Sequence, residues 1–162
     1  MPFGEETIDK LRLIRTPHIG PVSYRQLIAR FGSARAALDA LPDLVMRGGG
    51  KQLKVASRES VETEMKAVAA LGARYLFLDD ADYPQWLLHI DNAPPVLTIK
   101  GRMELLDHPL VAMVGARNAS AGACRFSRTL AYDLGQGGIM VVSGLARGID
   151  TAAHIGSLDS GT

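Results

Sequence analysis

The last third of the chain repeats one pattern: an apolar run, a loop with glycine and arginine, and a helical segment. Residues 110–114 read Leu-Val-Ala-Met-Val, and residues 139–143 read Ile-Met-Val-Val-Ser. Continuous apolar runs of this length are typical of strands that are buried on both faces of a parallel sheet. We expect helices over residues 120–135 and 150–158. The order strand, helix, strand, helix predicts two parallel strands joined by a right-handed crossover.

Each expected strand runs into a loop that suits an anion. The loops are residues 115–120 (Gly-Ala-Arg-Asn-Ala-Ser) and residues 143–148 (Ser-Gly-Leu-Ala-Arg-Gly). They open at the carboxyl ends of the strands, where helix N-termini present free N–H groups. If the strands are neighbours, about 4.8 Å apart, Arg117 and Arg147 converge and can grip phosphate oxygens. The predicted phosphate-binding residues are Gly115, Arg117, Asn118, Ser120, Ser143, Gly144, Arg147 and Gly148.

Other readings of this region fit the residues less well. The G-x-G-x-x-G fingerprint of dinucleotide sites is missing, because Gly115 is followed by Ala-Arg. Ser143, Asp150 and His154 could form a hydrolytic set, but Asp150 is better explained as a helix N-cap. The single cysteine, Cys124, is expected to be a small buried side chain. We therefore assign no catalytic residue and no cofactor.

The first 72 residues are predicted to be helical. Their apolar residues recur with helical spacing, and residues 18–21 (His-Ile-Gly-Pro) predict a tight turn. Residues 32–33 (Gly-Ser) predict the end of one helix and the cap of the next. Pro42 is expected to end the third helix. Ser57 is expected to cap a fourth that ends at Gly72.

Two segments between these regions resemble ligand sites. Residues 48–51 (Gly-Gly-Gly-Lys) look like a phosphate loop, but that motif would need glycine at Val45 and serine or threonine at Gln52. We interpret them as a flexible connector. Strands are expected over residues 74–78 and 96–99. The aspartates that follow the first of these strands are typical of a solvated turn, so we expect no metal there.

Composition excludes several classes of protein. The chain of 162 residues has a formal net charge of +1, a single cysteine and no apolar stretch near the roughly 20 residues that span a bilayer. Its start lacks the pattern of a signal peptide, so a cytoplasmic location is expected. The charge is unevenly distributed: residues 1–72 carry eleven Lys and Arg against eight Asp and Glu, and the rest carry seven against nine. The near-zero sum therefore does not argue against nucleic acid.

Four segments together resemble the DprA/Smf family, the bacterial DNA-processing proteins of natural transformation. The most specific are VVSGLARGIDTAAHIGSL and MVGARNASAGACRFSRTLA, which contain the two loops. The segment DADYPQWLLHIDNAPPVLTIKG is similar to the family's approach to its first buried strand. The segment LRLIRTPHIGPVSYRQLIARFGSARAALDAL is similar to its N-terminal SAM-like helical module.

The resemblance implies an α/β protein with a SAM-like or helix-hairpin-helix-like module over residues 1–72. An incomplete, extended Rossmann-like parallel sheet would follow over residues 73–162. It also implies binding and protection of single-stranded DNA, help in loading the RecA recombinase, and no known turnover. The family's phosphate-binding positions fall on Gly115, Arg117, Ser143, Gly144, Arg147 and Gly148, where many members have serine or threonine in place of Ala116.

Members of the family continue beyond the position of Thr162 with further strands, a basic loop, a dimerisation surface and often a winged-helix module. We therefore expect this chain to be the N-terminal portion of a longer, homodimeric protein.

Two alternatives stay open. A nucleoside-monophosphate phosphoribohydrolase uses a similar phosphate-binding sheet. The hairpin around residues 19–21 could contact a DNA duplex, or the helical module could be a protein-interaction or spacer module.

Overall fold

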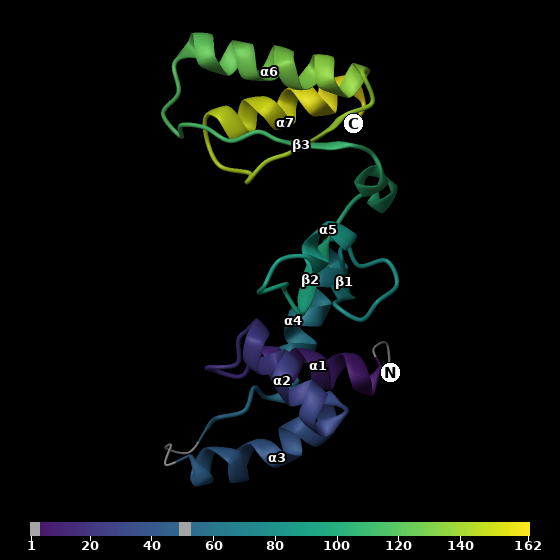
Figure 1. The fold of residues 1–162 in the computed structure, drawn as a ribbon, viewed down its shortest axis with the longest axis vertical. Helices are drawn as coiled ribbons and strands as arrows, with labels where there is room; N and C mark the ends of the chain where they lie inside the picture. The colour runs from purple at the N-terminus through teal and green to yellow at the C-terminus, as the bar shows by residue number, and fades with distance from the viewer. Residues whose placement is uncertain (1–3, 49–52) are drawn as a thin grey trace. The chain divides into compact units, whose positions relative to one another are not determined.

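The structure is a computed structural model that describes residues 4–48 and 53–162 (Figure 1). The predicted connector over residues 48–51 falls largely on residues 49–52, which lie outside the described residues. The chain divides into two compact units, Met1–Gly101 and Arg102–Thr162. The predicted change from helix to strand occurs at residue 74, whereas the compact units meet after Gly101. The proposed domain division at residues 72 and 73 stays a prediction.

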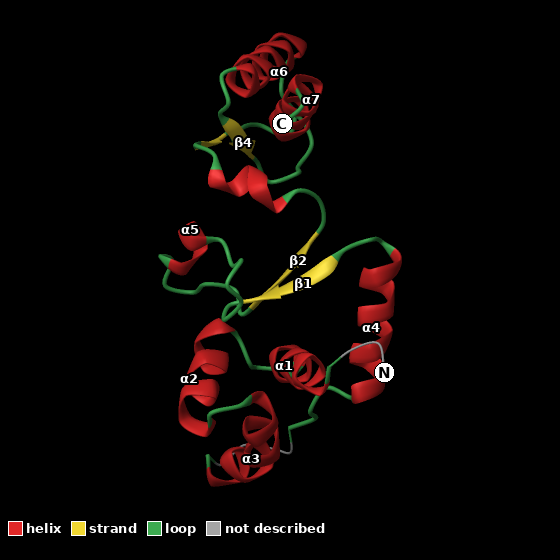
Figure 2. Cartoon of the chain, turned by 90° about the vertical axis from the view of Figure 1, so that its right-hand side faces the viewer, coloured by secondary structure: helices red, strands yellow, loops and turns green. Residues whose placement is uncertain are grey.

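The first unit consists of helices followed by a two-stranded hairpin (Figure 2). Its elements are α1 (Glu5–Arg15), α2 (Pro21–Phe31), α3 (Ala34–Arg47), α4 (Arg58–Ala70), β1 (Arg74–Phe77), α5 (Gln85–Leu88) and β2 (Val96–Ile99). The strands β1 and β2 pair antiparallel, with Leu76 opposite Leu97. They form a sheet of their own, so the parallel sheet expected after residue 73 begins only later in the chain.

The expected helix boundaries of this unit are confirmed with one exception. Gly32 ends α2 in the left-handed conformation, with φ 78°. The hydroxyls of Ser33 and Ser57 accept hydrogen bonds from the N–H groups at the starts of α3 and α4. The prediction that Pro42 ends the third helix is wrong, because α3 continues to Arg47. A proline costs one backbone hydrogen bond and some strain, and the burial of Leu41 beside it offsets that cost.

The core of the first unit has two clusters. One joins α1, α2 and α3 and consists of Leu13, Tyr24, Ala34, Ala37, Leu38 and Leu41. The other joins α1, α4 and the hairpin and consists of Ile8, Leu11, Val61, Met65 and Phe77. The hairpin therefore packs on the helices through Phe77.

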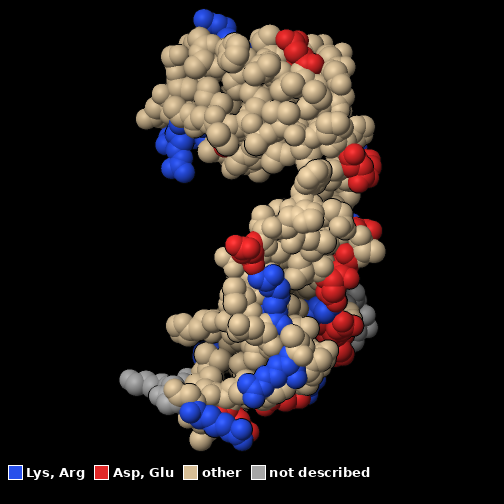
Figure 3. Space-filling view, in the orientation of Figure 1, with Lys and Arg blue, Asp and Glu red and all other residues tan. Residues whose placement is uncertain are grey.

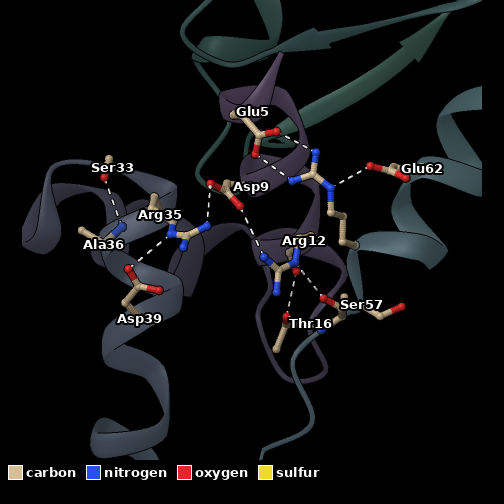
Figure 4. A network of polar contacts seen from close by, with 12 residues as sticks. Glu5, Asp9, Arg12, Thr16, Ser33, Arg35, Ala36, Asp39, Ser57 and Glu62 are labelled. Carbon is tan, nitrogen blue, oxygen red and sulfur yellow. Dashed lines mark hydrogen bonds and ion pairs between the residues drawn. The ribbon is translucent and has the colours of Figure 1, made fainter. Parts of the chain in front are cut away.

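Ion pairs link α1 to the neighbouring helices α3 and α4 (Figure 4). Arg58 contacts Glu5 at 2.6 Å and Glu62 at 2.7 Å, which links α1 to α4. Asp9 is buried and lies 3.4 Å from the Arg12 guanidinium and 3.9 Å from that of Arg35. These contacts fix α1 against its neighbours by charge as well as by apolar packing.

The second unit contains the predicted strand–helix repeat. Its elements are the 3-10 helix η1 (Met103–Asp107), β3 (Leu110–Ala112), α6 (Ala121–Gln136), β4 (Met140–Val142) and α7 (Ile149–Ser160). The prediction that the two strands are parallel is confirmed, with Val111 opposite Val141. Ser120 caps α6 by accepting from the Ala123 N–H at 3.2 Å, and Gly161, with φ 92°, ends α7.

The strands are less covered than their apolar sequence predicts. Val111 is 38% exposed and Val142 is 46% exposed, so the expectation of burial on both faces is wrong for the described residues. The sheet that these residues form has two strands, so each strand has an open edge and lacks a neighbour there.

The two helices of this unit pack closely side by side (Figures 1 and 2). A Cβ at Gly156 would overlap the carbonyl oxygen of Arg128, and it would lie 3.1 Å from the Ala131 Cβ. Ala131 and Ala153 are fully buried. Small residues on both helices thus permit the close approach that sets the position of α7 relative to the strands.

Among the described residues no helix is long and apolar enough to cross a membrane. In the same part of the chain, no group of three or more His, Cys, Asp and Glu side chains is placed to hold a metal ion.

Candidate phosphate-binding site

The loops that follow β3 and β4 lie against each other. We call residues 113–120 the first loop and residues 143–148 the second loop. The Ile149 N–H, just after the second loop, donates to the Ala116 carbonyl at 3.3 Å. The Ser143 hydroxyl donates to the Met113 carbonyl at 2.6 Å. These two bonds join the loops at both ends of the second one.

Two predicted glycines make this approach possible. Gly148 has φ 79° and ψ −120°, a backbone conformation that residues other than glycine rarely adopt. A Cβ there would overlap the Ala116 carbonyl oxygen and lie 2.6 Å from that of Arg117. A Cβ at Gly115 would lie 2.6 Å from the Ile149 Cγ1. Both glycines therefore permit the close contact between the two segments, and this role does not depend on which ligand the loops bind.

Asp150 holds the second loop closed. It lies in the first turn of α7 and not at its N-cap, which is Gly148, so the predicted cap is wrong. Its Oδ2 accepts from the Gly144 N–H at 3.1 Å and from the Ala146 N–H at 3.4 Å. The side chain is only 6% exposed. The N-cap lies two residues earlier than the sequence indicates, and the Asp150 carboxylate accepts from the loop that precedes the helix.

Arg117 and Arg147 are exposed, and their charges are not neutralised by any ion pair among the described residues. Their guanidinium groups also make no hydrogen bond within that part of the chain. Arg128 of the same unit differs, because it contacts Asp159 at 2.6 Å. In Figure 3, basic side chains stand out on the left of the second unit, the end at which Figure 1 draws the two loops. Two unpaired guanidinium groups on loops in contact form a candidate anion site.

Backbone N–H groups add donors to this end of the unit. Within the described residues, the N–H groups of residues 114–119 make no hydrogen bond. In the second loop the same holds for Leu145, Arg147 and Gly148, whereas Gly144 and Ala146 donate to Asp150. The first loop therefore offers more backbone donors than the second.

The predicted hydroxyls have different roles. Ser143 uses its proton on Met113 and so can only accept from a ligand. Ser120 accepts from Ala123, so its proton remains available to an anion at the start of α6. Asn118 is exposed on the first loop. All eight predicted residues thus lie on the two loops. Ser143 and Gly144, like Gly115 and Gly148, make contacts that position the loops.

The hydrolytic set that the sequence suggested is not assembled. Ser143 donates to a backbone carbonyl, and Asp150 accepts from backbone amides. The Nε2 atom of His154 is buried and has no hydrogen-bond partner among the described residues. None of these three described side chains is hydrogen-bonded to another. Cys124 is half-buried.

Two apolar residues of these loops are unexpectedly exposed. Leu145 is 82% exposed and has φ 56°, which is unusual for a residue with a Cβ. Val114, on the first loop, is 81% exposed. Nothing in the sequence predicts either feature, because leucine and valine after a strand normally indicate burial.

Two family models match the chain. The DprA-like N-terminal HHH domain matches residues 4–67, and DNA recombination-mediator protein A matches residues 74–162. The chain is 41% identical over 87 residues to the DNA processing protein DprA of Streptococcus pneumoniae, covering 54% of this chain and 30% of that protein. It is 29% identical over 137 residues to the Protein Smf of Escherichia coli, covering 81% and 36%.

Similarity extends to a solved structure. The crystal structure of DNA processing protein A from Streptococcus pneumoniae matches with a TM-score of 0.55 and 33% sequence identity. The match covers 65% of this chain and 35% of that one. The chain spans about a third of the length of these relatives.

Proposed function

Since the chain belongs to the DprA/Smf family of DNA recombination-mediator proteins, we propose that its two loops bind the phosphates of single-stranded DNA. The observation that carries this proposal is the pair of unpaired arginines, Arg117 and Arg147, on loops that touch through their backbones. Planar guanidinium groups can each hold two phosphate oxygens. The free N–H groups of the first loop would hold the remaining oxygens.

Such a site would not distinguish between DNA sequences. Arginine and backbone donors read phosphate oxygens, which are the same at every nucleotide. Aromatic residues make up 6% of the chain, so few of them are available for base stacking. Affinity would therefore depend mainly on ionic strength and little on base composition.

The remaining parts of the proposal concern the whole protein. We propose a cytoplasmic protein that protects incoming DNA, helps to load RecA, acts as a homodimer and catalyses no reaction. The relatives whose names mention DNA processing support the DNA part of this role. The lack of hydrogen bonds among the side chains of Ser143, Asp150 and His154 supports the proposal that the loops carry out no hydrolytic chemistry.

The test measures binding of a labelled single strand of about 30 nucleotides against salt concentration. We expect the slope of log affinity against log salt to become shallower by about 0.7 for each phosphate that the protein no longer neutralises. Arg117→Ala and Arg147→Ala should each show this change. Arg128→Ala is the matched control, because its charge is already paired with Asp159 in the same unit. Equal affinity and slope for the wild type and both loop variants would refute the proposed site.

The same preparation distinguishes the enzyme alternative. Release of free base from a nucleoside monophosphate would show phosphoribohydrolase activity. We expect no such release above the level without protein.

A further inference from the structure

The first unit contains a groove beside the turn between α1 and α2. We call it the hairpin groove, after the helical hairpin that α1 and α2 form and not after the strands β1 and β2. Its volume is about 680 Å³, within the range of sites that hold small ligands or peptide side chains. It is formed by residues of that turn, by α2 and α3, and by residues 53–54. The turn includes His18, which has φ 65° and projects from the surface.

The floor of the hairpin groove is apolar. Leu27, Leu41 and Val45 line it, and Leu41 is only 5% exposed. Leu27 is a half-buried residue that packs against the core cluster of α1, α2 and α3. The floor is thus the outer side of a packed core and presents a fixed apolar surface.

The rim of the hairpin groove is basic. Arg30 and Lys54 are exposed and line it together with His18, and no Asp or Glu is among the described residues that line it. Within the described part of the chain, Arg30 and Lys54 make no ion pair. The Arg30 guanidinium lies 5.2 Å from the centroid of the Phe31 ring, which limits its movement without using its donors.

A second hollow in the same unit has a different character. It has a volume of about 890 Å³ and is lined by carboxylates as well as by basic side chains. Several of those charges are paired with each other, as in the 2.6 Å contact of Lys10 with Asp79. The uniform positive sign of the hairpin groove is therefore a local property and not one of the whole unit.

We propose that the hairpin groove binds a short acidic peptide that carries large apolar side chains. The apolar side chains would fill the floor, and the carboxylates would face Arg30 and Lys54. A duplex backbone fits the groove less well, because a phosphate placed over Leu41 and Val45 would lose hydration without gaining a donor. The hairpin groove belongs to the first unit, so this proposal is independent of the loops in the second.

The experiment selects peptides from a random 12-residue library displayed on phage against the full chain. We expect enrichment of sequences that combine Asp or Glu with Leu, Ile, Phe or Trp. Anisotropy of a labelled selected peptide should then show about 10-fold weaker binding to Arg30→Glu/Lys54→Glu. The matched control, Lys66→Glu/Lys100→Glu, changes the net charge equally at exposed lysines outside the groove. Circular dichroism checks that both variants keep their helices.

Three results would overturn the proposal. The first is a selection that enriches no acidic residues, and the second is equal binding of the selected peptide to both double variants. The third is a result in which no acidic peptide binds and the protein instead binds a 20-base-pair duplex. If Arg30→Glu/Lys54→Glu lost that duplex binding and Lys66→Glu/Lys100→Glu kept it, the groove would be a nucleic-acid surface. A selected peptide whose acids are replaced by Lys should fail to bind.

Discussion

Replacing Asp150 tests whether one carboxylate holds the second loop closed. Asp150→Ala leaves the N–H groups of Gly144 and Ala146 without their acceptor. A hydrogen bond to a charged group contributes about 1.5–3 kcal/mol, and the bond at 3.4 Å is the weaker of the two. A carboxylate in the first turn of a helix adds about 0.5 kcal/mol. We therefore expect the second unit to lose about 2–4 kcal/mol of stability.

The assay must separate the two units. Trp86, the single tryptophan, lies in the first unit, so its fluorescence in a urea titration should be the same in Asp150→Ala and the wild type. Hydrogen exchange of the amides of α7 and of the second loop should become faster. Asp150→Asn is the matched variant, because its side-chain oxygen can still accept from both amides; it should lose about half as much stability as Asp150→Ala. Unchanged exchange at Gly144 and Ala146 in Asp150→Ala would refute this reasoning.

Two further predictions concern a glycine and a tyrosine. Gly148→Ala adds a Cβ against the first loop at a residue with φ 79°. The backbone strain alone costs about 1–3 kcal/mol, so thermal unfolding of the second unit should shift downward and single-strand affinity should fall. In the control Gly122→Ala, a Cβ meets only the Ser120 hydroxyl at 3.9 Å; because alanine favours the helix α6 that contains it, this variant should unfold at the same or a higher temperature and keep its single-strand affinity. Burial raises the pKa of Tyr24 to about 12. The tyrosine therefore keeps its proton in the folded protein at a pH near 10, at which the unfolded chain loses it. The free energy of unfolding of the first unit should fall as the pH rises from 10 to 12, because the folded state then binds more protons than the unfolded state. Tyr24→Phe should reduce that fall in urea titrations at pH 9 and 11.5, and an equal fall in both proteins would contradict the assigned cause.

The sequence predicts most elements of the fold because their signals are local. The caps Ser33 and Ser57 and the terminator Gly32 each work through the chemistry of one residue and its neighbours. The prediction for Pro42 is wrong because it considers only the local propensity of proline to end a helix. The tertiary packing of α3 outweighs the free-energy cost of a proline inside the helix.

The candidate site was predictable in its position and less so in its contacts. Glycine and arginine after two neighbouring strands indicate the two loops, and the structure places those loops in contact. The sequence does not reveal that the Asp150 carboxylate accepts a hydrogen bond from the second loop or that the Ser143 hydroxyl donates to the Met113 carbonyl. Both depend on distances between segments that are far apart in the chain, which residue patterns do not encode.

The core cluster of α1, α4 and β1 has a consequence for how the first unit can be divided. Phe77 of the hairpin completes a cluster whose other members, including Ile8 and Met65, come from the helices. Arg15 and Tyr75 also share the Glu64 carboxylate, at 2.8 Å and 2.9 Å. A fragment that stops at Gly72 would leave this apolar surface in water and invite self-association. A fragment that continues to Gly101 would keep the hairpin and bury the same surface.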